Sequence, residues 1–93
     1  TLVQMYDAPD VSLWHFDLYR LSGPDEVYEV GWDEARDGVA LVEWPERLGP
    51  LLPPERLDLT LTITGPGAAG EEARRATLSG PAFWAERLAG ALP

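Results

Sequence analysis

The sequence predicts a mixed α/β fold, in which a sheet with antiparallel additions is flanked by helices. Three observations predict it. Residues 39–42 form a wholly apolar run between turn-forming residues, which is typical of a strand buried on both faces. Residues 11–21 and 57–64 alternate between apolar and polar side chains, as half-buried strands do. Two further segments with helical character open at a proline, Pro24 and Pro81.

The first expected element is a β-hairpin over residues 2–21. Residues 2–6 are apolar and extended, and a turn signal over residues 7–10 separates them from the alternating segment 11–21. The alternation assigns two faces to that segment. Trp14, Phe16 and Leu18 are expected on one face, and His15, Asp17 and Tyr19 on the other.

A helical segment follows from Pro24, because proline suits the first helical position and acidic residues complement the helix dipole directly after it. Its apolar stripe consists of Val27, Val30 and Ala35. Gly31 is expected to break or kink the segment, which ends at Asp37-Gly38. The apolar strand 39–42 comes next, followed by a short helical turn over residues 46–52.

The last third predicts a second hairpin and a helix. In residues 57–64, Leu57, Leu59, Leu61 and Ile63 are expected to face a core, and a glycine-rich loop over 65–70 leads to a return strand at 72–78. After Pro81, Trp84, Leu88 and Leu92 recur at helical spacing, which predicts a helix packed on the sheet.

Composition narrows the possible functions. The 93 residues suffice for a single domain spanning residues 1–93. Cysteine is absent, which excludes disulfides and thiolate chemistry and favours a cytoplasmic location. Lysine is absent too, so all seven basic residues are Arg. The net charge of −9 disfavours direct nucleic-acid binding, and no apolar run is long enough to span a membrane.

Glu43 is the most informative candidate site residue, because it directly follows the apolar strand and ligands bind at the carboxyl ends of strands in α/β sheets. Its carboxylate could hold Mg²⁺ or orient water. It could equally be a solvated acid or pair with an arginine. The adjacent Trp44 could stack on a ligand base or shield the site, or it could be a core residue at the sheet edge.

Asp17 lies within the first hairpin, where it could bind a metal-bound water or a nucleotide phosphate. The alternative is an exposed carboxylate on a solvated face. His15 shares that face, and a lone histidine is a weak metal signal. It is expected as a polar-face residue or as a hydrogen-bond partner of Asp17. Arg20 could hold a phosphate or form an ordinary surface ion pair.

Two sequence motifs are more informative about function than the composition is. His15-Phe16-Asp17-Leu18-Tyr19-Arg20-Leu21 and Glu43-Trp44-Pro45-Glu46-Arg47-Leu48 resemble the bacterial threonylcarbamoyladenosine biosynthesis ATPase family TsaE, also called YjeE. Further segments match in order along the whole chain. The resemblance implies the carboxyl-terminal part of a P-loop NTPase-like mixed sheet with β-hairpins and flanking helices.

The resemblance also implies a function. Members of the family are cytoplasmic P-loop ATPases that work with TsaD and TsaB to make threonylcarbamoyladenosine in tRNA. By motif, Asp17 matches the functional aspartate near the nucleotide and Mg²⁺, Glu43 the acid at the Mg²⁺ site, and Trp44 the tryptophan beside it. These matches imply ATP and Mg²⁺ as cofactors, with tRNA reached only through the partners.

The sequence departs from the family in one large respect: the Walker A loop, with its phosphate-binding lysine, does not occur in these residues. We therefore expect this chain alone to be inactive and the complete protein to be the ATPase. The rival hypothesis is a non-catalytic, acidic α+β module that binds a basic protein. A Walker A motif encoded upstream in the same reading frame would favour the ATPase.

Overall fold

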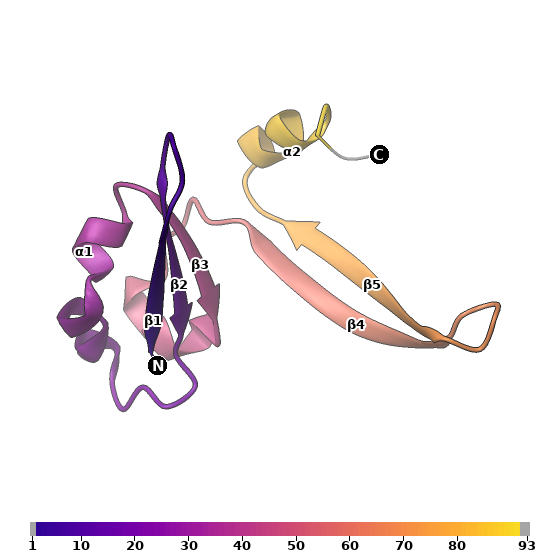
Figure 1. The fold of residues 1–93 in the computed structure, drawn as a ribbon, viewed down its shortest axis with the longest axis horizontal. Coiled ribbons are helices and arrows are strands. Elements are labelled where there is room, and N and C mark those ends of the chain that lie inside the picture. Colours follow the sequence, from indigo (N-terminus) through magenta and orange to yellow (C-terminus); the bar gives the residue numbers. More distant parts are fainter. Residues whose placement is uncertain (1, 92–93) are drawn as a thin grey trace. The chain divides into compact units, whose positions relative to one another are not determined.

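The computed structural model describes residues 2–91 and divides the chain into two compact units (Figure 1). Unit 1 comprises residues 1–52 and unit 2 residues 53–93. The division reflects contacts within the chain and not independent folding, so the single domain expected over residues 1–93 stays a prediction.

Unit 1 contains a three-stranded mixed sheet in the order β1-β2-β3. Strand β1 (Val3–Asp7) pairs antiparallel with β2 (Ser12–Asp17), which confirms the first hairpin. Strand β2 ends at Asp17 rather than at residue 21. The chain turns there, because the Tyr19 amide donates to Oδ1 of Asp17 at 3.2 Å and the Leu21 amide donates to the Leu18 carbonyl at 3.0 Å.

The helical connection from β2 to β3 has two parts. A 3-10 helix, η1 (Pro24–Val30), is followed by the short α1 (Trp32–Ala35). Gly31 separates them with a φ of 94°, in the left-handed region that favours glycine. The expected start at Pro24 and break at Gly31 are both confirmed.

The core of unit 1 lies between one face of the sheet and these helical segments. The Phe16 and Trp32 rings meet edge to face, with centroids 5.4 Å apart. A second 3-10 helix, η2 (Pro45–Leu51), adds Leu48 to the same core. The fully or nearly fully buried residues are Phe16, Leu18, Leu21, Val27, Trp32, Ala35 and Leu48.

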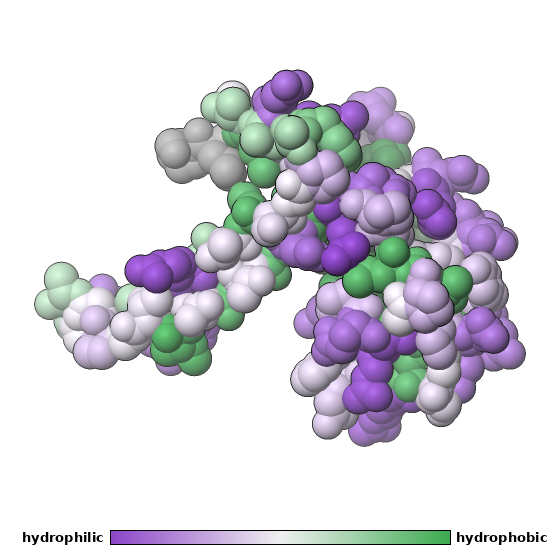
Figure 2. All heavy atoms as spheres, turned by 180° about the vertical axis from the view of Figure 1, so that it is seen from behind, coloured by the Kyte–Doolittle hydropathy of each residue, from purple (hydrophilic) through white to green (hydrophobic). Residues whose placement is uncertain are grey.

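Strand β3 (Val39–Glu43) pairs parallel with β2, but the expectation that both its faces are buried is wrong. Val39 and Leu41 are 47% and 53% exposed. Val42 packs against the core from the other face. The physical reason is that no described element of unit 1 covers the face of β3 that carries Val39 and Leu41. Hydrophilic residues dominate the side of unit 1 seen in Figure 2, with hydrophobic residues exposed among them.

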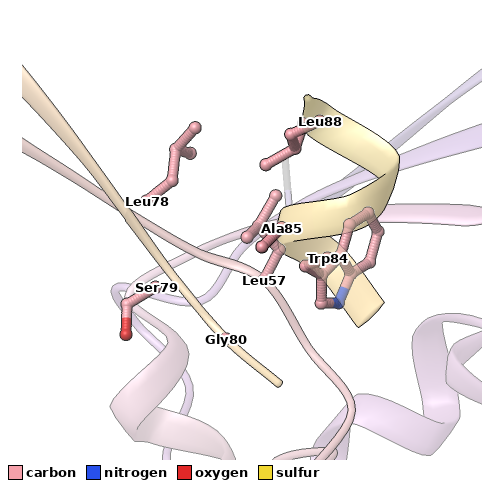
Figure 3. A pocket seen from close by; sticks show the side chains of 7 residues that line it. All are labelled: Leu57, Leu78, Ser79, Gly80, Trp84, Ala85 and Leu88. Carbon is pink, nitrogen blue, oxygen red and sulfur yellow. The ribbon is translucent and has the colours of Figure 1, made fainter. Parts of the chain in front are cut away.

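Unit 2 is the expected second hairpin and helix. Strand β4 (Asp58–Pro66) pairs antiparallel with β5 (Glu72–Ser79), and α2 (Ala82–Leu88) follows. The Trp84 indole Nε1 donates to the Glu55 carbonyl at 2.7 Å and so fixes α2 beside the base of the hairpin. A pocket of about 280 Å³ lies between them, with Leu57 and Leu78 on the hairpin and Trp84, Ala85 and Leu88 on α2 (Figure 3).

The expectation that β4 faces a core is wrong along most of its length. Leu59, Leu61 and Ile63 are 56%, 66% and 66% exposed, because no described element of unit 2 forms a second layer against this two-stranded ribbon. The predicted helix is confirmed for Trp84 and Leu88, while Leu92 lies outside the described residues. Among residues 2–91, no helix is long and apolar enough to cross a membrane. The mixed α/β fold class is confirmed.

Candidate functional site

Strand pairing brings the two predicted acidic residues together. In the parallel ladder between β2 and β3, Asp17 is the register partner of Glu43, and both are the last residues of their strands. Adjacent strands lie about 4.8 Å apart, and register partners direct their side chains to the same face. The carboxyl edge of the parallel pair therefore carries both acidic residues on one face.

Asp17 is exposed and is held by its own turn. Its Oδ1 accepts a hydrogen bond from the Tyr19 amide at 3.2 Å, and its own amide donates to the Leu2 carbonyl at 2.9 Å. These contacts orient the carboxylate by local backbone geometry. Since the carboxylate is not buried, its second oxygen can reach solvent or a ligand.

Glu43 is held across the sheet. Its Oε2 lies 2.8 Å from Nε2 of His15, and its carbonyl accepts a hydrogen bond from the Leu18 amide at 3.2 Å. His15 was expected to be a polar-face residue or a partner of Asp17. The structure gives it Glu43 as partner instead, because Glu43 lies diagonally across the ladder from His15 on the same face. Arg20, the remaining candidate, is exposed.

Trp44 has an unusual backbone conformation. Its φ of 60° and ψ of 50° place it in the left-handed region, and it is the one residue other than glycine with a positive φ among residues 2–91. The ring packs on Tyr19, with centroids 4.8 Å apart and planes tilted by 53°. Trp44 is 46% exposed, so the alternative of a buried core tryptophan is wrong. Trp44 directly follows Glu43 in the sequence, and Tyr19 lies two residues after Asp17.

The donor set fits Mg²⁺ in one limited sense. Mg²⁺ in nucleotide sites is bound through one or two carboxylates, several waters and the phosphates of the substrate, rather than by an all-protein cage. Asp17 and Glu43 would supply such carboxylates. Within the described part of the chain, no three His, Cys, Asp or Glu side chains are grouped closely enough to hold a metal ion by themselves.

Two site contacts were not expected from the sequence. The His15–Glu43 and Tyr19–Trp44 contacts both join residues far apart in the chain. Predicting these contacts would require the parallel register of β2 and β3. The alternation of side chains along each strand does not reveal that register. That Asp17, Glu43 and Trp44 act on a ligand stays a prediction.

Comparisons with known proteins give one consistent answer. The model of the family described as "Threonylcarbamoyl adenosine biosynthesis protein TsaE" matches residues 1–74. The "tRNA threonylcarbamoyladenosine biosynthesis protein TsaE" of Rickettsia typhi is 40% identical over 63 residues, which cover 67% of this chain and 44% of the relative. The Bacillus subtilis protein of the same name is 36% identical over 67 residues, which cover 70% of this chain and 41% of the relative.

A solved structure agrees with these sequence matches. The crystal structure of YdiB from Bacillus subtilis superimposes with a TM-score of 0.65 at 32% sequence identity, over 98% of this chain and 54% of the solved chain. This chain therefore spans about half the length of the relatives that it matches.

Proposed function

Because this chain belongs to the TsaE family, we propose that it forms part of a Mg²⁺-dependent ATPase required for the threonylcarbamoyladenosine modification of tRNA. The names of the relatives support the pathway. ATP hydrolysis and the partner proteins TsaD and TsaB are part of the proposal, as is a cytoplasmic location. tRNA is reached only through the partners.

The observation that carries the proposal is the register of Asp17 with Glu43 at the carboxyl edge of two parallel strands. Ligands of open α/β sheets bind at this edge. Bound Mg²⁺ neutralises charge on the phosphates of ATP. The residues of this chain would hold that cation and its waters through Asp17 and Glu43. Trp44 and Tyr19 would wall the site and limit the access of bulk water.

These 93 residues do not contain the Walker A loop that binds the phosphates in sites of this class. Phosphoryl-transfer sites of this class use a cradle of backbone amides and a lysine. The 93 residues contain no lysine. Two acids without a cation would repel ATP, so the proposal assigns these residues to the metal side of the site and leaves the phosphate cradle to residues beyond them.

The distribution of charge supports a protein partner over direct tRNA contact. Residues 1–52 carry eleven acidic residues and three arginines, so most of the net charge of −9 lies in unit 1. Such a surface repels a phosphate backbone and favours basic protein surfaces.

The test is Glu43→Gln in the full-length gene product that contains these residues. The variant keeps the shape of the side chain and removes its charge. We expect ATP turnover to fall about 100-fold or more, because several kcal/mol of transition-state stabilisation depend on the metal site. Glu29→Gln is the matched control, since Glu29 is an exposed acid on η1.

The readout is steady-state ATP hydrolysis at a series of Mg²⁺ concentrations. Unchanged turnover and unchanged Mg²⁺ dependence in Glu43→Gln would contradict the proposal and favour the non-catalytic acidic module. A loss in both variants would point to a general effect of charge instead of a site.

A further inference from the structure

The contact between His15 and Glu43 has a geometry that stability alone does not explain. Nε2 of His15 lies 2.8 Å from Oε2 of Glu43, and the two side chains are 31% and 57% exposed. Pairs as exposed as this one contribute little to folding stability. The contact does fix one oxygen of a flexible glutamate at the sheet edge where Asp17 also lies.

His15 is poorly suited to be a metal ligand itself. Within the described chain it belongs to no metal-binding group, and its Nε2 is already engaged by Glu43. Carboxylates that bind metals are commonly held by a second hydrogen bond, which orients them before the cation arrives. The His15 contact has this form: it engages Oε2 and leaves Oε1 as the oxygen available to a cation.

We propose that His15 is a positioning residue, which holds Oε2 of Glu43 through Nε2 so that the carboxylate is preoriented for Mg²⁺. This inference rests on the proposed function, because it assigns Glu43 to the cation. The sequence predicted His15 only as a polar-face residue or as a hydrogen-bond partner of Asp17. His15 lies on β2, the strand next to the one that carries Glu43, and it is two residues before Asp17 on the same face. This position brings its ring to the Glu43 carboxylate.

Three variants of the full-length gene product test the role. His15→Ala removes the donor. His15→Gln keeps an N–H group that can reach a carboxylate. Gln4→Ala is the matched control, because Gln4 is the register partner of His15 on β1 and its side-chain oxygen accepts from the Tyr6 hydroxyl instead of contacting Glu43.

Calorimetric titration of Mg²⁺ in the presence of ADP is the first measurement. We expect His15→Ala to weaken Mg²⁺ binding about tenfold, at the lower end of the usual cost of losing such a partner. His15→Gln should recover most of this loss, and Gln4→Ala should bind as the parent does. In the Glu43→Gln background, adding His15→Ala should cause no further weakening.

A second measurement needs no metal. In ¹H–¹⁵N spectra of the metal-free protein, the His15 ring should show the tautomer that is protonated on Nε2, and Glu43→Gln should change that pattern. Thermal melting of each variant identifies losses caused by unfolding.

The outcomes separate the two proposals. If Glu43→Gln binds Mg²⁺ normally and keeps full turnover, both the proposed function and the role of His15 are overturned. If Glu43→Gln loses Mg²⁺ but folded His15→Ala behaves like Gln4→Ala, only the role of His15 is overturned. Additive losses from His15→Ala and Glu43→Gln would also overturn it, since a positioning residue acts only through its partner.

Discussion

The Asp17 carboxylate combines a structural hydrogen bond with a negative charge, and the two can be tested separately. Oδ1 accepts the Tyr19 amide and shapes the turn that ends β2, while the negative charge faces the sheet edge beside Glu43. Asparagine retains Oδ1 and removes the charge. One substitution can therefore separate the structural part of this residue from its proposed part in the site.

We expect Asp17→Asn to lower ATP turnover of the full-length protein while changing the free energy of unfolding by no more than about 0.5 kcal/mol. Steady-state hydrolysis and thermal melting measure the two effects. Asp10→Asn, in the exposed turn between β1 and β2, is the control. A protein that melts early but hydrolyses ATP normally per folded molecule would assign Asp17 to structure alone.

The backbone of Trp44 is strained, because a left-handed conformation costs a residue with a Cβ about 1–2 kcal/mol. Such strain is found where the surrounding structure over-determines a conformation, often at functional sites. Here the conformation places the indole against Tyr19 at the end of β3.

Trp44→Gly and Trp44→Ala both remove the ring, but only glycine removes the strain. We expect the Gly variant to have a free energy of unfolding about 1 kcal/mol higher than that of the Ala variant, and therefore to unfold at a higher temperature. Arg47, exposed within η2, should show the opposite order, with Ala more stable than Gly. If the Ala variant is more stable than the Gly variant at position 44 as well, the positive φ of Trp44 is not imposed by the fold.

At the scale of elements, sequence patterns predicted local structure better than burial. Both hairpins, the break at Gly31 and the turn after Trp44-Pro45 follow from alternation and from turn residues, which act over a few neighbours. The burial of Val39, Leu41 and the leucines of β4 depends on what lies against a strand, and periodicity carries no information on that.

The same distinction holds for the site. The sequence motifs predicted Asp17, Glu43 and Trp44 as site residues. Their contacts with His15 and Tyr19 could be seen only from the parallel register of β2 and β3. Register between strands that are separated by a helical connection is a tertiary property, so the motif predicted the acids but not what holds them.

Gly31 sets the geometry of that helical connection. A Cβ added there would lie 2.6 Å from Cζ3 of Trp14, and the φ of 94° is itself unfavourable for alanine. We expect Gly31→Ala to destabilise the protein by about 2 kcal/mol or more, as judged by chemical denaturation. Gly23→Ala is the control: its Cβ would meet nothing within 4 Å, and its φ of −156° suits any residue. Equal effects of the two substitutions would contradict this account.

At the scale of the whole molecule, the chain combines the proposed Mg²⁺ site with an excess of negative charge. Residues 1–93 have a net charge of −9 and no lysine, and Asp17 and Glu43 add local repulsion toward phosphates. Most of the affinity of phosphate-binding loops comes from backbone amides and a lysine, which this chain does not provide.

We therefore expect a polypeptide of residues 1–93 to bind Mg²⁺–ATP no tighter than about 1 mM, equivalent to roughly −4 kcal/mol, and not to hydrolyse it. Calorimetric titration measures the affinity. Micromolar binding would place the nucleotide elsewhere, and the roles assigned to Asp17 and Glu43 would have to be withdrawn. The full-length gene product, titrated in parallel, is the positive control.

The parallel pairing of β2 with β3 has a consequence for how the gene can vary. The spacing of Asp17 and Glu43 is set by hydrogen bonds between strands and not by the segment over residues 18–38 that joins them. Extra codons at the exposed Ser22, in the turn before η1, would lengthen the route between the acids while leaving their separation intact. A single codon lost within β3 would instead turn Glu43 to the opposite face of the sheet. Natural insertions and deletions should accordingly collect in the turn and be absent from the strand.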